Sequence, residues 1–317
     1  MRLVAMPGIN DALFHPAYFF GLVTSGLTVG SIYALMAISL VVTFRASGHI
    51  NFAQGEMGTL GTFVVFTLCV QHGLPYWLAV PLVILLSILF GAGVDRGLIR
   101  PVERRGPQGA MLATLGLYLI FNAVTAIIWG VDQVAPITPF PSKVHDQWVL
   151  LDGPPQFALR YSTLYIWVTV AVVTTALVLL MQRTRLGLSY RAAATNPDSA
   201  SLVGIPVGLM RTFGWGLAAA VGSIAAILFS AQGGALDFNL MSGVLLFGLA
   251  TAAFGGFDSI GGAVIGGLVV GLVEMLLPAL FTFIGGQLST VTALLVIVVV
   301  LLIRPYGLFG NKPVERV

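Results

Sequence analysis

Long runs without a charged side chain constrain this chain more than any other feature of its sequence. Eight such runs follow one another, at 12–44, 57–94, 106–131, 161–182, 212–236, 238–257, 259–273 and 275–303. About 20 apolar residues cross the hydrocarbon core of a bilayer as a helix. Only 9% of the residues are charged, against about 25% in an ordinary soluble domain. The sequence therefore predicts an all-α polytopic membrane protein, with a single membrane domain over 1–317.

The number of spans depends on how two of these stretches are divided. The run 57–94 is about twice as long as one span needs, and the polar turn Gln71–Pro75, which ends in a helix breaker, interrupts it. Only Glu274 separates the last two runs, and Ile284–Gln287 is a better place to divide them. We expect nine spans, with eight as the alternative.

Basic residues set the predicted orientation, because Lys and Arg are enriched in cytoplasmic loops beside membrane helices. If 95–109 is cytoplasmic, alternation of the spans places twelve of the fifteen Lys and Arg residues inside; Arg2, Lys143 and Arg160 lie outside. The N-terminus is then outside and the C-terminus cytoplasmic. The same asymmetry explains the net charge of +3 without nucleic-acid binding.

The stretch Gly21–Gly61 joins an apolar run to a polar patch. Gly26 and Gly30 lie four positions apart, which stacks them on one helix face and lets a neighbouring backbone approach closely. Similar ladders of small residues occupy 214–234 and 263–271. The polar patch consists of Arg45, His49, Asn51, Gln54 and Glu56. We interpret this combination as a packed, multi-helix transport body.

Ionisable residues inside predicted spans are costly, since even low values for a carboxylate at the bilayer centre are about 2.5–3.5 kcal/mol. Glu274 is expected to face the bundle or an aqueous path, and it either fixes helices together or lines the pathway. Glu56 is expected near the inner end of its span, where its side chain can snorkel to the surface. The residues that we select as pathway lining are Asn51, Gln54, Glu56, Asn122 and Glu274.

Two polar segments stand out between the spans. The outside segment 132–160 is rich in proline and is expected to form an extended loop with little helix, either a connector or a docking surface for a soluble partner. The cytoplasmic segment 182–211 should hold a short helix that Asn196 caps, with Pro197 as its first residue, and that ends at Gly204. Such a helix fits either a groove on a partner protein or the membrane interface.

Several patterns are absent. Neither of the two lysines, Lys143 and Lys312, lies in a P-loop frame, so ATP binding through that motif is excluded for this chain. The four histidines have no metal-binding spacing, and no G-x-S-x-G elbow occurs. We therefore expect no enzyme activity, no catalytic residues, no metal and no bound cofactor.

Five segments resemble one known family in the same order. They are GLTVGSIYALMAISLVVTF with GHINFAQGEMGTLGTF, MLATLGLYLIFN, RTRLGLSYRAAATNPDSASLVGI, GGFDSIGGAVIGGLVVGLVE and RPYGLFG. The chain thus resembles the permeases of branched-chain amino acid ABC importers over nearly its whole length. Its compact length and the NFAQGE segment are similar to the LivH type, although Gln54 stands where His is frequent in that family.

The resemblance implies a permease of the bacterial inner membrane with a periplasmic N-terminus. It implies pairing with a second, related permease, two cytoplasmic subunits that use ATP and Mg, and substrate delivery by a periplasmic binding protein onto a face that includes 132–160. Within 182–211, the coupling element that contacts the ATP-binding subunits would comprise Arg191, Asn196, Asp198, Ala200, Gly204 and Ile205.

The cargo is less constrained than the architecture. A hydrophobic amino acid has few polar groups to recognise, and a largely apolar pathway leaves little trace in a sequence. The same importer type for urea, amides or small aromatic acids is an alternative. An ion-coupled secondary transporter or a channel, acting alone, is the alternative from a different class.

Overall fold

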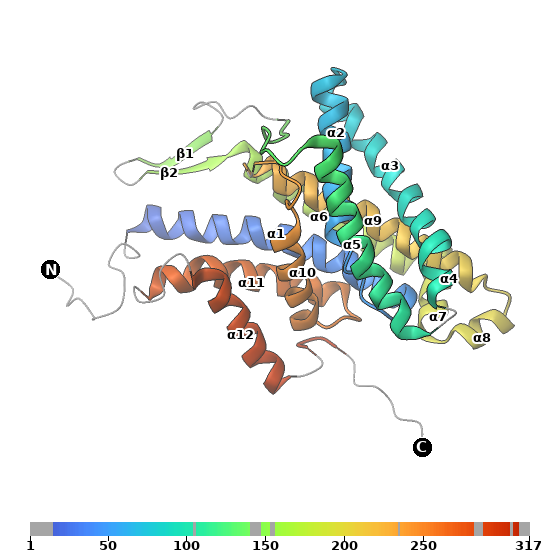
Figure 1. Cartoon of the computed structure of the whole chain (residues 1–317). Coiled ribbons are helices and arrows are strands. Elements are labelled where there is room, and N and C mark those ends of the chain that lie inside the picture. Colours follow the sequence, from blue (N-terminus) through green and yellow to red (C-terminus); the bar gives the residue numbers. More distant parts are fainter. Residues whose placement is uncertain are drawn as a thin grey trace.

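The computed structural model describes residues 15–103, 106–139, 147–152, 156–233, 235–281, 288–304 and 307–310. Helices dominate this part of the chain (Figure 1). The elements are α1 (Pro16–Ser47), α2 (Gln54–Phe66) with the π-helical turn η2 (Thr67–Gln71), α3 (Tyr76–Val94) with the π-helical turn η3 (Asp95–Ile99), α4 (Arg100–Glu103), α5 (Pro107–Trp129), β1 (Gln147–Leu151), β2 (Phe157–Arg160), α6 (Tyr161–Arg183), α7 (Arg185–Thr195), α8 (Pro197–Leu202), α9 (Val207–Ala231), α10 (Ser242–Gly255), α11 (Ile260–Leu280) and α12 (Ser289–Ile303).

Six helical stretches in the described residues are long and apolar enough to cross a membrane: Pro16–Ser47, Tyr76–Glu103, Gln108–Trp129, Tyr161–Arg183, Val207–Ala231 and Ile260–Leu280. The polar turn predicted to divide 57–94 does so, since η2 ends at Gln71 and α3 begins at Tyr76. The remaining expected spans coincide with α2–η2, α10 and α12. With 14 residues, α10 is about 21 Å long, shorter than the hydrocarbon core. The count of nine spans therefore stays a prediction.

The segment 132–160, which we expected to be an extended loop with little helix, contains the two strands of the structure's sheet. Within 132–160, β1 and β2 form an antiparallel hairpin that pairs Gln147 with Arg160 and has an irregularity between Val149 and Leu151. Trp148, Val149 and Leu151 supply the β-branched and large apolar side chains that favour a strand. The hairpin lies at the end of the molecule where α1 begins (Figure 1). Part of the proline-rich segment, 140–146 and 153–155, lies outside the described residues.

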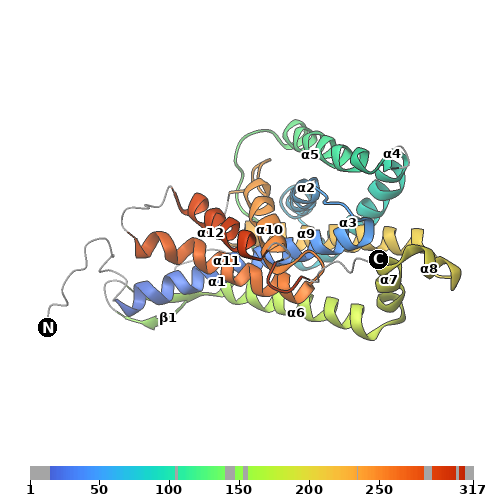
Figure 2. The ribbon, with the colours of Figure 1, turned by 90° about the horizontal axis from the view of Figure 1, so that it is seen from below.

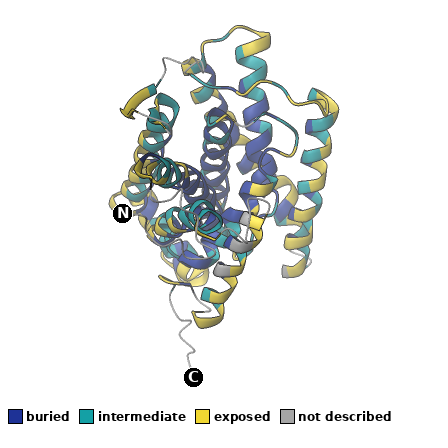
Figure 3. Ribbon diagram, turned by 90° about the vertical axis from the view of Figure 1, so that its left-hand side faces the viewer, coloured by how far each residue is buried: buried dark blue, intermediate teal, exposed yellow. Residues whose placement is uncertain are grey.

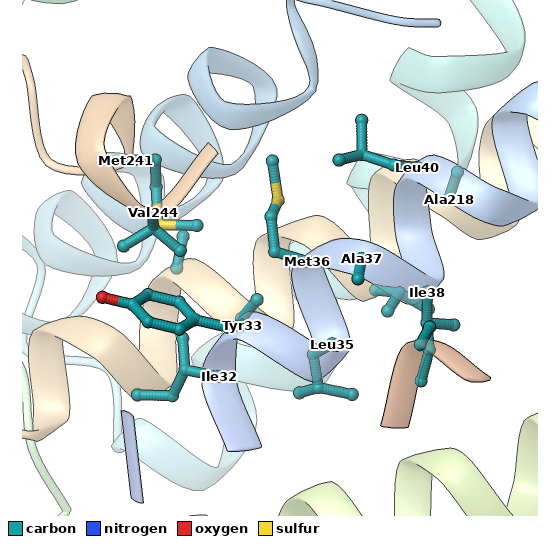
Figure 4. Packing of buried hydrophobic residues seen from close by; sticks show 14 of the residues in the cluster. Ile32, Tyr33, Leu35, Met36, Ala37, Ile38, Leu40, Ala218, Met241 and Val244 are labelled. Carbon is teal, nitrogen blue, oxygen red and sulfur yellow. The ribbon is translucent and has the colours of Figure 1, made fainter. Parts of the chain in front are cut away.

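Buried residues gather in the interior of the bundle (Figure 3), and α1 and α9 are the two most buried of the six candidate spans. Ile32, Leu35 and Ile38 of α1 are completely buried. In Figure 4, Tyr33 lies beside Met241 and Val244, which come from the start of α10. Glycines set the closest approach between α1 and α11. A Cβ atom on Gly30 would lie 2.6 Å from the carbonyl oxygen of Gly267. The ladder of small residues on α1 therefore packs against that of α11, which agrees with the expectation that a neighbouring backbone approaches it closely.

The helix contacts reveal an internal repeat. One unit consists of α1, α2, α3 and α5, and the other of α9, α10, α11 and α12. Helices at the same place in each unit pack on the first helix of the other unit. In the first unit, α2 and α3 pack on α9; in the second unit, α10 and α11 pack on α1. The outer helices correspond only in part, because α5 packs on α2 whereas α12 packs on both α10 and α11. Similar tripeptides, Ile50-Asn51-Phe52 and Leu236-Asp237-Phe238, precede α2 and α10. Paired repeats of this kind are common in transporters.

The two ends of the bundle differ in character (Figures 1 and 2). Arg45, Arg211 and the α7–α8 segment surround one cavity at the end opposite the hairpin. Arg96 and Arg100 hydrogen-bond Thr212 at that same end. Of the predicted cytoplasmic cations, Arg45, Arg96, Arg100 and Arg211 are thus gathered at one end, whereas Arg104, Arg105, Lys312 and Arg316 lie outside the described residues. Which side of the membrane this end faces stays a prediction.

Candidate functional site

A polar cluster lies where α2 begins, inside the bundle. The amide nitrogen of Asn51 donates to Gln54 Oε1 at 2.9 Å, and Asn51 Oδ1 accepts from the backbone N–H of Ala53 at 3.1 Å. Gln54 Nε2 in turn donates to the backbone oxygen of Ala218 on α9 at 2.8 Å. Asn51 and Gln54 are at most 1% exposed. These hydrogen bonds satisfy two buried amides and fix the start of α2 to α9.

The depth of this cluster differs from the sequence prediction. Ala218 lies near the middle of α9, which runs from Val207 to Ala231. Glu56 lies in the first turn of α2, so it is near the end of its helix as expected. Its side chain is completely buried, however, and the snorkelling that we considered possible does not occur, because α2 starts beside the centre of α9. The predicted patch is accordingly divided, with Arg45 left at the helix end and Asn51, Gln54 and Glu56 in the interior.

Glu56 lies between the first turns of two helices. It belongs to the first turn of α2, and its Oε1 accepts from the hydroxyl of Ser242, the first residue of α10, at 3.5 Å. Ser242 also lies 3.3 Å from the hydroxyl of Tyr118 on α5. Helix N-termini carry partial positive charge, so one carboxylate here stabilises both helices. Glu56 Oε2 makes no hydrogen bond within the described residues.

Asn122 joins α5 to the connection before α10. Its amide nitrogen donates to the backbone oxygen of Phe238 at 3.1 Å and to Asn239 Oδ1 at 3.0 Å. Asn122 also neighbours the Glu56 carboxylate. The structure therefore brings four of the five selected pathway residues together around the starts of α2 and α10.

Glu274 forms a separate pair on the other side of the core. The hydroxyl of Tyr33 donates to Glu274 Oε2 at 2.8 Å, and the Tyr33 ring stacks on Phe247 of α10 with 4.8 Å between the ring centroids. Glu274 is 9% exposed. It faces the bundle and is hydrogen-bonded, as expected, and its partner holds α1 against α11.

The segment between α6 and α9 forms two short helices. Thr184 caps α7 by accepting from the N–H of Gly187, and Asn196 caps α8 by accepting from the N–H of Ser199. The predicted cap and first residue of α8 are confirmed. The turn after α8 has Gly204 at a φ of +81°, which glycine adopts without strain, and the N–H of Ile205 donates to Ala200 at 3.0 Å.

The apolar side chains of α8 point in different directions. Ala200 is buried, whereas Leu202 is 86% and Val203 76% exposed. Asp198 is exposed, and Arg191 on α7 is half-buried. Leu202 and Val203 are therefore large, exposed apolar side chains at this end of the molecule.

Sequence reasoning missed Tyr190. Its hydroxyl donates to the backbone oxygen of Val42 on α1 at 2.6 Å, and burial raises the pKa of this hydroxyl above its usual value. Gly214 on α9 packs against Tyr190 as well. Tyr190 thus ties α7 to both central helices. No local signal marks it, because its partner is a backbone group far away in the sequence.

A second missed feature is an ionic network around Asp95, which is completely buried. Asp95 pairs with Arg100 at 2.8 Å and with Arg211 at 2.8 Å, and Arg211 also pairs with Glu103. The hydroxyl of Thr212 donates to Asp95 at 2.9 Å. Sequence reasoning used this charged segment only to orient the chain. In the structure it joins η3 and α4 to the start of α9.

Comparison with family models identifies one family. The family model described as "Branched-chain amino acid transport system / permease component" matches residues 22–304. The chain is similar to the high-affinity branched-chain amino acid transport system permease protein LivH of Escherichia coli (strain K12), with 29% identity covering 95% of this chain and 98% of the relative. It is also 29% identical to BraD of Pseudomonas aeruginosa, a permease of the same description, over 92% and 96%. A chain of PsaBC from Streptococcus pneumoniae in complex with Fab aligns with a TM-score of 0.47 and 10% identity, over 92% and 93%.

Proposed function

The chain belongs to the family of branched-chain amino acid transport permease components, and from this premise we propose that it forms half of the translocation path of an ABC importer for branched-chain amino acids. It is a multi-pass membrane protein and a permease component, not an enzyme. Membership of an ABC transporter family implies assembly with other transporter subunits.

The polar cluster where α2 and α10 begin carries the proposal. Four polar side chains, Asn51, Gln54, Glu56 and Asn122, are grouped around the starts of α2 and α10; the first three are buried and Asn122 is half-buried. Irregular backbone at membrane depth is tolerated where it is buried in protein or lines a cavity, and in transporters interrupted helices commonly mark the pathway. Glu274, on the opposite side of α10, is the fifth residue of the proposed pathway.

Three kinds of partner complete the proposed importer. A second, related permease supplies the other half of the path, and two cytoplasmic subunits bind ATP with Mg. A binding protein delivers the amino acid from the periplasm to the face that includes the hairpin. The α7–α8 segment, with Arg191, Asn196, Asp198, Ala200, Gly204 and Ile205, is the proposed contact with the ATP-binding subunits. Its exposed Leu202 and Val203 support this assignment.

The cation distribution supports an orientation in the bacterial inner membrane. The end that carries Arg45, Arg100, Arg211 and α7–α8 is proposed to face the cytoplasm. The hairpin and the start of α1 are then periplasmic.

Reconstitution tests the proposal. The chain is co-expressed with a candidate second permease, ATP-binding subunits and a binding protein, purified as a complex and inserted into liposomes, and uptake of radiolabelled leucine is followed with and without ATP. We expect ATP-dependent uptake that requires the binding protein and that Glu56→Gln lowers at least tenfold. Uptake driven by an ion gradient, by the chain alone and without ATP, would refute the proposal. Preference for urea, an amide or an aromatic acid over leucine would reject the cargo and keep the architecture.

A further inference from the structure

A polar cavity of about 330 Å³ lies at the end of the molecule that carries the hairpin. Its walls come from the N-terminal part of α1, from β2, from the first turn of α6 and from Gln232, which follows α9. The three elements α1, β2 and α6 contact one another around it. Binding sites for small molecules commonly have 300–1,000 Å³. None of the residues proposed for the pathway or for the coupling segment lines this cavity.

The cavity walls carry free hydrogen-bonding groups. Arg160, the last residue of β2, is exposed, and its guanidinium group makes no hydrogen bond or ion pair with any described residue. The hydroxyls of Ser25, Ser162 and Thr163 likewise make no hydrogen bond within the described part of the chain. Among the described residues, no carboxylate lines the cavity. A guanidinium group beside several hydroxyl donors is a binding site for an anion, and phosphate is one that arginine binds well.

The length of α6 places the cavity relative to the membrane. This helix, Tyr161–Arg183, has 23 residues and is therefore about 34 Å long, slightly more than the hydrocarbon core of about 30 Å. Its two ends must then lie close to the two boundaries of the core. Ser162 and Thr163 belong to its first turn, so the cavity opens at the level of the lipid headgroups.

Aromatic side chains mark the same level. The ring centroids of Trp148 and Tyr161 lie 6.2 Å apart beside the start of α6, and those of Trp77 and Tyr165 lie 5.9 Å apart where α3 begins. Trp and Tyr are enriched where a membrane protein meets the headgroups. Farther along α6 the side chains of Val168 and Val172, both exposed, offer lipid chains an apolar surface.

These properties define the class of ligand. A phospholipid has a phosphodiester with one negative charge at headgroup depth, which matches the single guanidinium group of Arg160. An ammonium headgroup would find no carboxylate on the described walls. A glycerol headgroup adds hydroxyls that can bond to Ser162, Thr163 and the exposed amide of Gln156.

We propose that this cavity binds the headgroup of an anionic phospholipid, with Arg160 as the contact of its phosphate and the hydroxyls of Ser25, Ser162 and Thr163 as further donors. The site requires only that the chain spans a membrane, so it is independent of the cargo and of ATP. A bound headgroup touches β2, α1 and α6 at once and therefore holds the hairpin against the bundle.

Native mass spectrometry of the full-length chain in detergent tests the ligand class. The protein is titrated with phosphatidylglycerol, with phosphatidylethanolamine, and with glycerol 3-phosphate, which has the phosphate but no acyl chains. We expect phosphatidylglycerol to bind at least fivefold more tightly than phosphatidylethanolamine and at least tenfold more tightly than glycerol 3-phosphate. Equal affinity for the two lipids overturns the proposal. Glycerol 3-phosphate that binds as tightly as phosphatidylglycerol also overturns it, since the site would then bind a soluble anion.

Variants locate the lipid in this cavity. Arg160→Gln should weaken the affinity for phosphatidylglycerol at least fivefold, and Arg160→Lys, which keeps the positive charge, should weaken it less. Arg183→Gln changes an exposed cation at the other end of α6 and should leave the affinity unchanged. Unchanged affinity in folded Arg160→Gln protein, or an equal loss in Arg183→Gln, overturns the proposal.

Filling the cavity gives a test that leaves Arg160 in place. Gly21 lines the cavity, and a Cβ atom on it would have no neighbour within 4 Å, so Gly21→Leu can occupy the space without displacing the backbone. A ligand that binds the folded state raises its melting temperature. Phosphatidylglycerol should therefore raise the melting temperature of the wild type more than that of Gly21→Leu. Size-exclusion profiles identify variants that fail to fold, and an equal rise in the two folded proteins contradicts binding in this cavity.

Discussion

The hydroxyl of Tyr33 on α1 donates a 2.8 Å hydrogen bond to the carboxylate of Glu274 on α11, across 241 positions of the chain. Both side chains are buried or nearly so, and the Tyr33 ring also stacks on Phe247 of α10. Three helices of the core therefore meet at one polar contact. An unpaired carboxylate in this position would be costly, so the contact is expected to matter for stability even if no cargo touches it.

Replacement of the two partners should separate packing from transport. Tyr33→Phe leaves Glu274 without its donor and should lower the free energy of unfolding by about 1–3 kcal/mol. Glu274→Gln retains an acceptor for Tyr33 and should change stability by less. Thermal unfolding in detergent measures the stability of both variants. ATP-driven uptake by the assembled importer measures their effect on transport. If Glu274→Gln and Glu274→Ala both leave uptake unchanged, Glu274 has no role in the pathway and serves only to join helices.

Close packing of α1 on α11 gives a second prediction. A Cβ atom on Gly30 would lie 2.6 Å from a backbone oxygen, which cannot move aside as the end of a side chain can, whereas a Cβ atom on Gly21 would have no neighbour within 4 Å. Gly30→Ala should therefore destabilise the protein by about 1–3 kcal/mol. Gly21→Ala, on the same helix, is the matched control and should be neutral or slightly stabilising. Equal melting temperatures for the two variants would contradict the close approach.

Much of the helical framework follows from the sequence, because apolar runs and helix caps are local signals. The break at Gln71–Pro75 and the cap at Asn196 could be predicted for this reason. The depth of the polar cluster could not, since it depends on Gln54 bonding to Ala218, which is 164 positions away. The start of α10 beside Glu56 depends likewise on contacts between distant segments.

His49 gives a prediction about pH. It follows α1, its ring lies 5.9 Å from that of Trp215, and burial is the main cause that lowers its pKa below the usual value. Glu103 and Asp95 oppose this shift and Arg211 adds to it. Because the folded state disfavours the protonated ring, the unfolded state binds more protons once the pH falls below about 6.5. Stability should therefore decrease as the pH falls from 7.5 to 5.5.

The variant His49→Gln should weaken this pH dependence. The drop in melting temperature between pH 7.5 and pH 5.5 should be smaller in His49→Gln than in the wild type. His72→Gln, which changes an exposed histidine, should retain the wild-type drop. An identical drop in all three proteins would show that other groups control the acid sensitivity.

The exposed end of α8 leads to the last prediction. Leu202 and Val203 project from the α7–α8 segment. At a binding surface, replacing apolar side chains of this size with carboxylates removes much of the apolar contact area with the partner. Leu202→Asp with Val203→Asp should therefore reduce co-purification of the ATP-binding subunits at least tenfold. Thr195→Asp adds one negative charge at an exposed polar position of the segment and should leave the complex intact. Asp198→Arg combined with Gly204→Trp should also release or uncouple these subunits. Because Gly204 has a positive φ, Gly204→Ala measures the contribution of backbone strain alone. Normal co-purification and uptake in both double variants would exclude this segment as the coupling element.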